Sequence, residues 1–131
     1  MQAMGPTSKT EDPGKAPFDR ASLWERVNED MELLRDLLQI FKQESPVMLQ
    51  KLQAALEQKS FPDVAKFSHK LKGSALQFSA SPAAATAARL EKMGQSHVLE
   101  GSAEAFEQLK NEITDLVEAL RQMIQGKGPR T

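Results

Sequence analysis

The chain has 131 residues, enough for one domain with its own core, and its formal net charge of −1 gives no electrostatic reason to expect binding to nucleic acid or to an anionic membrane. It contains no cysteine, which excludes disulfides and thiolate chemistry and suits a cytoplasmic location, and no apolar run approaches the ~20 residues of a membrane span. Tyrosine is absent and valine and isoleucine are scarce, so the composition favours helices over strands.

Both ends of the chain differ from the middle in composition. Residues 1–17 contain three prolines, two glycines and almost nothing apolar, so we expect a disordered arm, partly of expression-vector origin. Residues 127–131 are expected to form a disordered tail. The domain itself is predicted over 18–126. It would begin with a short N-terminal helix around Trp24, with Asp19 or Ser22 as the N-cap.

A long helix is predicted over residues 30–58. Its core-facing positions are separated alternately by four and three residues, the pattern of a helix packed lengthwise on others: Leu34, Leu38, Phe41, Ser45, Met48, Leu52 and Ala55. Pro46 interrupts this pattern, because a proline within a helix removes a backbone hydrogen bond. We therefore expect either a kinked helix or two collinear segments.

Three further helices complete the predicted fold. Their predicted ranges are 61–78, 81–94 and about 102–125. Ser60 is the expected N-cap of the first of these helices, and Gly94 is expected to end the second. Four substantial helices with short links predict an all-α fold, an antiparallel up-and-down four-helix bundle preceded by the short N-terminal helix.

The helix over 61–78 carries two stripes of side chains. The stripe expected to face the core follows the three-four rule: Phe61, Val64, Ala65, Phe67 or Ser68, Leu71, Ala75 and Phe78. The second stripe has offsets of 0, 3, 4 and 7 and is turned away from the first: His69, Lys72, Gly73 and Leu76. The second stripe therefore predicts an exposed histidine.

The residues around His69 favour phosphoryl transfer. Gly73 costs ~1 kcal/mol in mid-helix relative to alanine, and we expect it to leave space for another molecule beside the imidazole. Lys72 would balance the charge of a phosphoryl group, and Ser74 would offer a hydroxyl to the site or to the helix carbonyls. An exposed neutral imidazole is a competent nucleophile. Taken singly, each residue has a non-functional explanation: a surface histidine, a glycine that serves helix packing and a solvated lysine. The combination of the three is a more specific sign of function than any one of them.

The stretch HKLKGSA, residues 69–75, resembles the hallmark of the histidine-containing phosphotransfer (HPt) domain of bacterial phosphorelays, approximately His-Thr-Leu-Lys-Gly-Ser-Ala. The resemblance covers about residues 18–125 and includes the pair Leu90-Glu91 in the following helix. The chain departs from the family pattern at Lys70, where a small polar residue is common, and at residues 77–80, where Gln-Phe-Ser-Ala replaces Asn-Leu-Gly-Ala.

The resemblance implies a mechanism and a set of partners. His69 would accept phosphoryl through Nε2 from a receiver-domain aspartyl-phosphate and pass it to another receiver aspartate, while Glu91 would hydrogen-bond Nδ1. Receiver domains would supply Mg²⁺, so the chain is expected to need no cofactor or metal of its own and to have no autonomous enzyme activity. A sensor histidine kinase, in cis or in trans, is a further expected partner. We expect a monomer that docks partners around His69 through Lys66, Lys70, Ser74 and Leu76.

Two other functions fit the same residues. The domain would instead be the histidine-bearing module of a chemotaxis-type kinase, phosphorylated with ATP, or a non-catalytic helical interaction bundle. The sequence leaves open whether the domain is free-standing or belongs to a hybrid kinase. His97 is expected to be an ordinary loop histidine, because nothing pairs it with His69 as a metal site.

Overall fold

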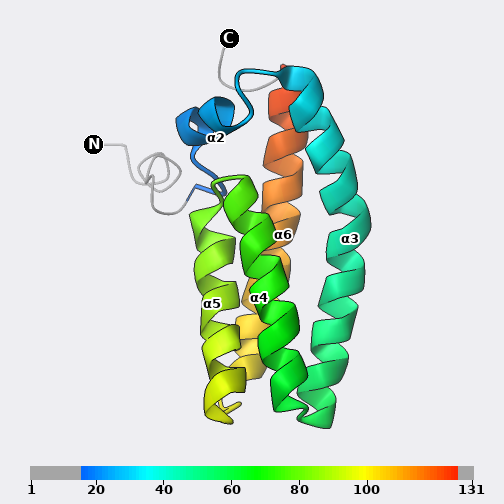
Figure 1. Ribbon diagram of the computed structural model, residues 1–131, viewed down its shortest axis with the longest axis vertical. Helices are drawn as coiled ribbons and strands as arrows, with labels where there is room; N and C mark the ends of the chain where they lie inside the picture. Colours follow the sequence, from blue (N-terminus) through cyan, green and yellow to red (C-terminus); the bar gives the residue numbers. More distant parts are fainter. Residues whose placement is uncertain (1–15, 127–131) are drawn as a thin grey trace, which may run out of the picture.

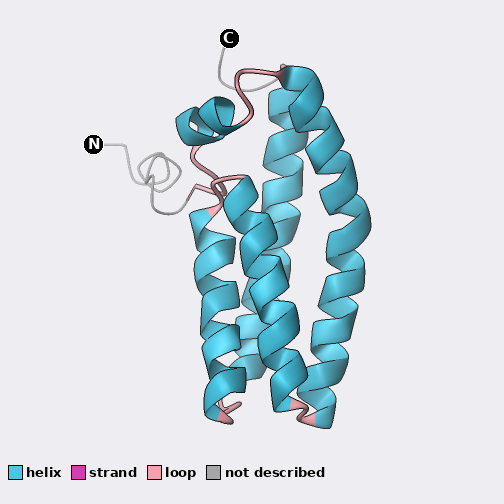
Figure 2. Ribbon diagram, in the orientation of Figure 1, coloured by secondary structure: helices cyan, strands magenta, loops and turns pink. Residues whose placement is uncertain are grey.

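The computed structural model describes residues 16–126, and all regular secondary structure in this range is helical (Figure 2). The helices are α2 (Arg20–Arg26), α3 (Met31–Gln58), α4 (Phe61–Gln77), α5 (Ser81–Ser96) and α6 (Ser102–Ile124). The prediction of an all-α fold is confirmed for these residues. The expected N-terminal arm lies outside the described residues except for residues 16 and 17, and the expected C-terminal tail lies wholly outside them.

The long helices α3 to α6 lie side by side, and the chain reverses direction at each link (Figure 1). They pack in a ring, with α3 against α4, α4 against α5, α5 against α6 and α6 against α3. The most extensive of these contacts joins α4 to α5. The interior is dominated by leucines that are wholly or almost wholly buried: Leu34, Leu52, Leu71, Leu90, Leu109, Leu116 and Leu120.

Helix α3 continues through Pro46 without interruption, so the alternative of two separate segments is wrong. Pro46 removes the N–H that would pair with the carbonyl of Lys42, and both residues are exposed, so water can satisfy that carbonyl. The N-cap of the helix is Asp30, whose side chain accepts hydrogen bonds from the backbone N–H groups of Glu32 and Leu33. A well-capped start and a buried stripe therefore hold one long helix despite the proline.

Helix α5 runs two residues past Gly94, which corrects the prediction that this glycine ends the helix. Gly94 is buried against α4. A Cβ atom at this position would lie 2.7 Å from the backbone nitrogen of Ala65 and 2.9 Å from the carbonyl oxygen of Phe61. The glycine is therefore needed for the close approach of α4 and α5, and the helix ends instead at His97, in the left-handed conformation with φ 60°.

The short helix α2 is fastened to the turn between α4 and α5. Ser79 in this turn has φ 55°, and its hydroxyl pairs with that of Ser22 at 2.8 Å and accepts a hydrogen bond from Arg26 Nε at 3.1 Å. The side chain of Asp19 caps α2 by accepting from the backbone N–H of Ser22. Ser79 thus adopts the backbone conformation that glycine favours, while its side chain ties α2 to the bundle.

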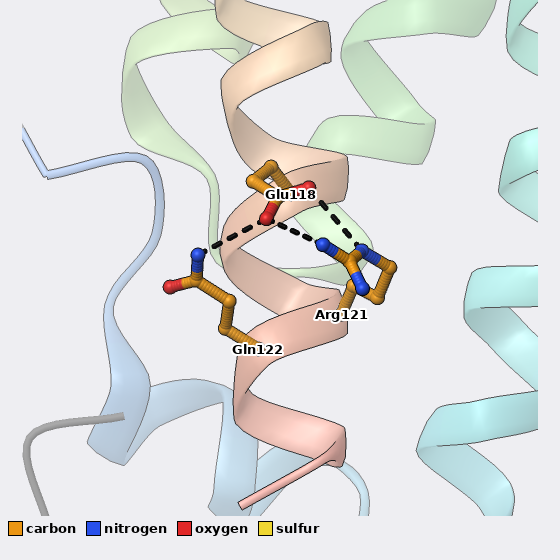
Figure 3. A network of polar contacts seen from close by, with 3 residues as sticks. All are labelled: Glu118, Arg121 and Gln122. Carbon is orange, nitrogen blue, oxygen red and sulfur yellow. Dashed lines mark hydrogen bonds and ion pairs between the residues drawn. The ribbon is translucent and has the colours of Figure 1, made fainter. Parts of the chain in front are cut away.

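The polar side chains near two helix ends behave differently. Ser60 occupies the N-cap position of α4 but makes no side-chain capping bond, so the predicted cap is present in position only. Near the end of α6, Glu118 accepts hydrogen bonds from Arg121 Nη2 at 2.7 Å and from Gln122 Nε2 at 3.0 Å (Figure 3). Hydrogen bonds from Arg121 and then from Gln122 hold the pKa of Glu118 below its usual value.

Candidate functional site

His69 projects from the outer wall of α4 and is held by a residue of α5. Its Nδ1 lies 3.0 Å from Oε2 of Glu91, and 66% of its side chain is exposed. A carboxylate oxygen can only accept, so Nδ1 carries the hydrogen, and in the neutral ring Nε2 then holds the lone pair. Within residues 16–126, Nε2 has no hydrogen-bonding partner. The ring is therefore oriented by one nitrogen and open to solvent at the other.

Glu91 also binds Lys72 through its second oxygen, with Nζ 2.9 Å from Oε1. The hydrogen bond from Lys72 is the main cause of a lowered Glu91 pKa, the hydrogen bond from His69 adds to it, and burial opposes both. The Glu91 side chain is 14% exposed, against 29% for Lys72. The carboxylate is thus kept ionised between an ammonium group and an imidazole, and both of these come from successive turns of α4.

Gly73 leaves an open spot on the surface one turn after His69. A Cβ atom placed there would have no atom within 4 Å beyond its own helix neighbourhood. Close helix packing therefore does not explain this glycine, although it does explain Gly94. The nearby Leu76 is 45% exposed, so an apolar side chain lies on the same outer face as the imidazole.

A groove between α3 and α4 borders this face. From α4 it is lined by Lys70, Gly73, Ser74 and Gln77, and from α3 by residues that include Val47 and Met48. Ser74 therefore faces α3 and makes no side-chain hydrogen bond to another described residue, so it does not join the His69–Glu91 pair. Of the expected docking residues, Lys70 and Ser74 therefore line the groove, whereas Leu76 lies on the same face as the imidazole.

The α3 wall of this groove was not predicted from the sequence. Exposed apolar side chains recur every seven residues along α3: Leu33, Ile40 and Val47, which are 39%, 49% and 46% exposed, and of these Val47 lines the groove. This second repeat is displaced by one position from the core repeat that includes Leu34, Phe41 and Met48. This second apolar repeat, next to the buried stripe, is the sequence pattern from which an exposed apolar surface on α3 could have been predicted.

A half-buried aromatic ring lies at the other end of the same face. Two lysines approach Phe67: Lys66 Nζ is 5.3 Å from the ring centroid and Lys51 Nζ, from α3, is 5.8 Å from it. Neither lysine forms an ion pair with any described residue. The core position that the sequence left open between Phe67 and Ser68 belongs to Ser68, which is fully buried.

The remaining features of the described residues are structural. His97 stacks on Phe61 at the far end of the α4–α5 pair, with the ring centroids 4.4 Å apart. No group of three or more metal-binding side chains occurs among residues 16–126. In the same range, no helix combines the length and apolarity needed to cross a bilayer.

Comparison with known proteins gives one family and one similar structure. The family model of the Hpt domain matches residues 36–122. The crystal structure of histidine-containing phosphotransfer protein B (HptB) from Pseudomonas aeruginosa PAO1 is similar to this chain, with a TM-score of 0.79 and 21% sequence identity, covering 86% of this chain and 97% of that one. A search of curated proteins finds no match.

Proposed function

Because the chain belongs to the Hpt domain family, whose members are histidine phosphotransfer modules of phosphorelays, we propose that His69 is its phosphoryl-accepting residue. One observation carries this proposal: the imidazole is fixed at Nδ1 by Glu91 at 3.0 Å, while 66% of the side chain is exposed. Lys72 and the bare backbone of Gly73 lie beside it, so an incoming phosphoryl group meets a cation and no obstructing side chain.

The proposed step is an in-line transfer from a receiver aspartyl-phosphate. The Nε2 lone pair forms the N–P bond as the P–O bond to the aspartate breaks, and the aspartate leaves as a carboxylate. The ring becomes positively charged while Nδ1 keeps its hydrogen, and the ionised Glu91 balances that charge. Lys72 balances the phosphoryl oxygens. The reverse sequence delivers the group to a second receiver aspartate.

Hpt domains work with receiver domains of response regulators, and we infer the finer features of this chain from that role. It acts as a monomeric carrier in the cytoplasm, without catalysis of its own, on an up-and-down four-helix bundle with α2 as its first short helix. The receiver supplies Mg²⁺ and the acidic pocket, so the chain contributes only the nucleophile, its orienting groups and a docking face. A sensor histidine kinase, in cis or in trans, stands upstream.

The test is to supply phosphoryl groups from two kinds of donor. Receiver domains loaded with phosphate should label the wild-type chain, and the label should be acid-labile, as expected for phosphohistidine. His69→Gln should abolish labelling with little change in thermal midpoint, because the side chain is exposed. His97→Gln is the matched control, since these are the two histidines of the chain, and it should label normally.

ATP with a histidine-kinase domain is the comparison donor. If only that donor labelled the chain, the domain would be the histidine-bearing module of a chemotaxis-type kinase and not a carrier that accepts phosphoryl groups from receivers. No labelling of the wild type from any donor would leave a helical interaction bundle.

A further inference from the structure

The lysine pair at Phe67 is the feature that the phosphotransfer chemistry does not use. Lys66 and Lys51 come from different helices, and both hold their ammonium groups within 6 Å of one aromatic ring. The ring attracts each cation, and both lysines are exposed. Neither ammonium group has a carboxylate partner among residues 16–126, so an acidic side chain of another protein can pair with them.

We propose that Lys51, Phe67 and Lys66 form an acid-recognising contact, which binds a carboxylate side chain of the receiver domain and sets the orientation in which that domain docks. The inference rests on the proposed function, because the partner is the one that must reach His69. Lys66 precedes His69 by three residues and so lies one turn away on the same exposed side of α4. A protein that covers the imidazole therefore also covers this contact.

The surface around His69 is different at its two ends, which is why the contact sets an orientation. At Phe67 it carries Lys51 and Lys66. Toward the end of α4 it presents Leu76 and Val47 beside the uncharged Gln77, and Lys70 lines the groove next to His69. Glu44 is the carboxylate of the groove, and it lies on the side away from the lysine pair. A receiver with acidic residues on one side of its docking face and apolar residues on the other fits one way round.

The experiment measures phosphoryl transfer from a panel of isolated receiver domains loaded with acetyl phosphate, as a function of receiver concentration. Lys51→Glu and Lys66→Glu should each raise KM about tenfold while kcat stays within about twofold, because rim charges act on encounter more than on the chemical step. The arginine variants at both positions should keep the wild-type KM. Salt should raise the wild-type KM more steeply than that of the reversed variants.

Two controls separate recognition from general effects. Lys42→Glu changes the same charge on the side of α3 that faces α6, and it should leave KM unchanged. Phosphoramidate, a small donor with no docking surface, should label every variant at the wild-type rate. The lysine contact would be refuted if KM rose equally for Lys42→Glu and Lys51→Glu, or if KM rose for neither Lys51→Glu nor Lys66→Glu. The proposed function of His69 would stand in both cases. A wild type that takes phosphoryl from no receiver would remove the proposed function, and the inference with it.

Discussion

Lys72 of α4 and Glu91 of α5 form an ion pair across the most extensive helix contact in the molecule, with Nζ 2.9 Å from Oε1. The other oxygen of Glu91 is engaged with Nδ1 of His69. One carboxylate thus couples the proposed nucleophile to the cation beside it, so a change at either partner should be felt at the other.

Replacing Lys72 by methionine removes the charge and keeps most of the side-chain volume. We expect transfer to slow by roughly 10- to 100-fold, the range for loss of one electrostatic contact to a transition state. The pKa of Glu91 should rise toward its ordinary value, because the main cause of its depression is lost. Carboxyl-carbon NMR of Glu91 and rapid-quench transfer rates measure the two effects. An unchanged Glu91 titration would mean that the ion pair does not persist in solution.

The Glu91 network should make stability depend on pH in the acid range. The folded-state pKa of Glu91 is lowered, so its contribution is present above the unfolded value of about 4.3 and is lost as pH falls through the folded pKa. The difference in unfolding free energy between wild type and Glu91→Gln should therefore be present at about pH 5 and shrink in stronger acid. Urea titrations from about pH 5 downward test this, and a difference that grows over that range would contradict it.

Gly73→Ala should make the domain more stable and less active. The added methyl group meets no atom within 4 Å, so the helix gains about 1 kcal/mol of propensity without a clash. The same methyl group stands where the proposed phosphoryl donor must approach. Thermal unfolding together with transfer rates measures both changes, and a variant that transfers at the wild-type rate would show that the open spot has no role in docking.

Gly94→Ala should have the opposite effect on stability. Its methyl group would fall 2.7 Å from the Ala65 nitrogen, which is backbone and can move only if α4 and α5 separate. We expect a loss of roughly 1 to 3 kcal/mol, as for overpacked cores. Urea unfolding of this variant beside Gly73→Ala gives a matched pair of identical substitutions with opposite expected signs. A stabilised Gly94→Ala would show that the helices tolerate a wider spacing.

The helices and the exposed imidazole were predictable because they rest on local patterns. Three-four spacing located the core stripe of α3, and offsets within one helix placed His69 and Gly73 on its outer side. Glu91 was different, because its position opposite His69 depends on how α5 packs on α4. Spacing alone did not give that relationship, and only the family resemblance implied it.

One local prediction was wrong, and one choice stayed open, for reasons that lie in tertiary packing. Gly94 looked like a helix terminator, since its contact with the Ala65 backbone leaves no trace in nearby sequence. Hydrophobicity alone would choose Phe67 over Ser68 for the core, yet Ser68 is buried and its hydroxyl has no partner among the described residues. The larger ring lies at the α3–α4 surface, where it holds two lysines.

Nε2 of His69 has no hydrogen-bonding partner within the described part of the chain, and this has a consequence for how the domain would signal. A phosphoryl group attached to Nε2 would leave the packing beneath it as it is, so we expect the loaded and empty forms to share one shape. They differ only in the electrical character of a small area of surface. A protein that distinguishes the two forms must therefore contact that area directly, because no conformational change elsewhere in the bundle would report the phosphorylation.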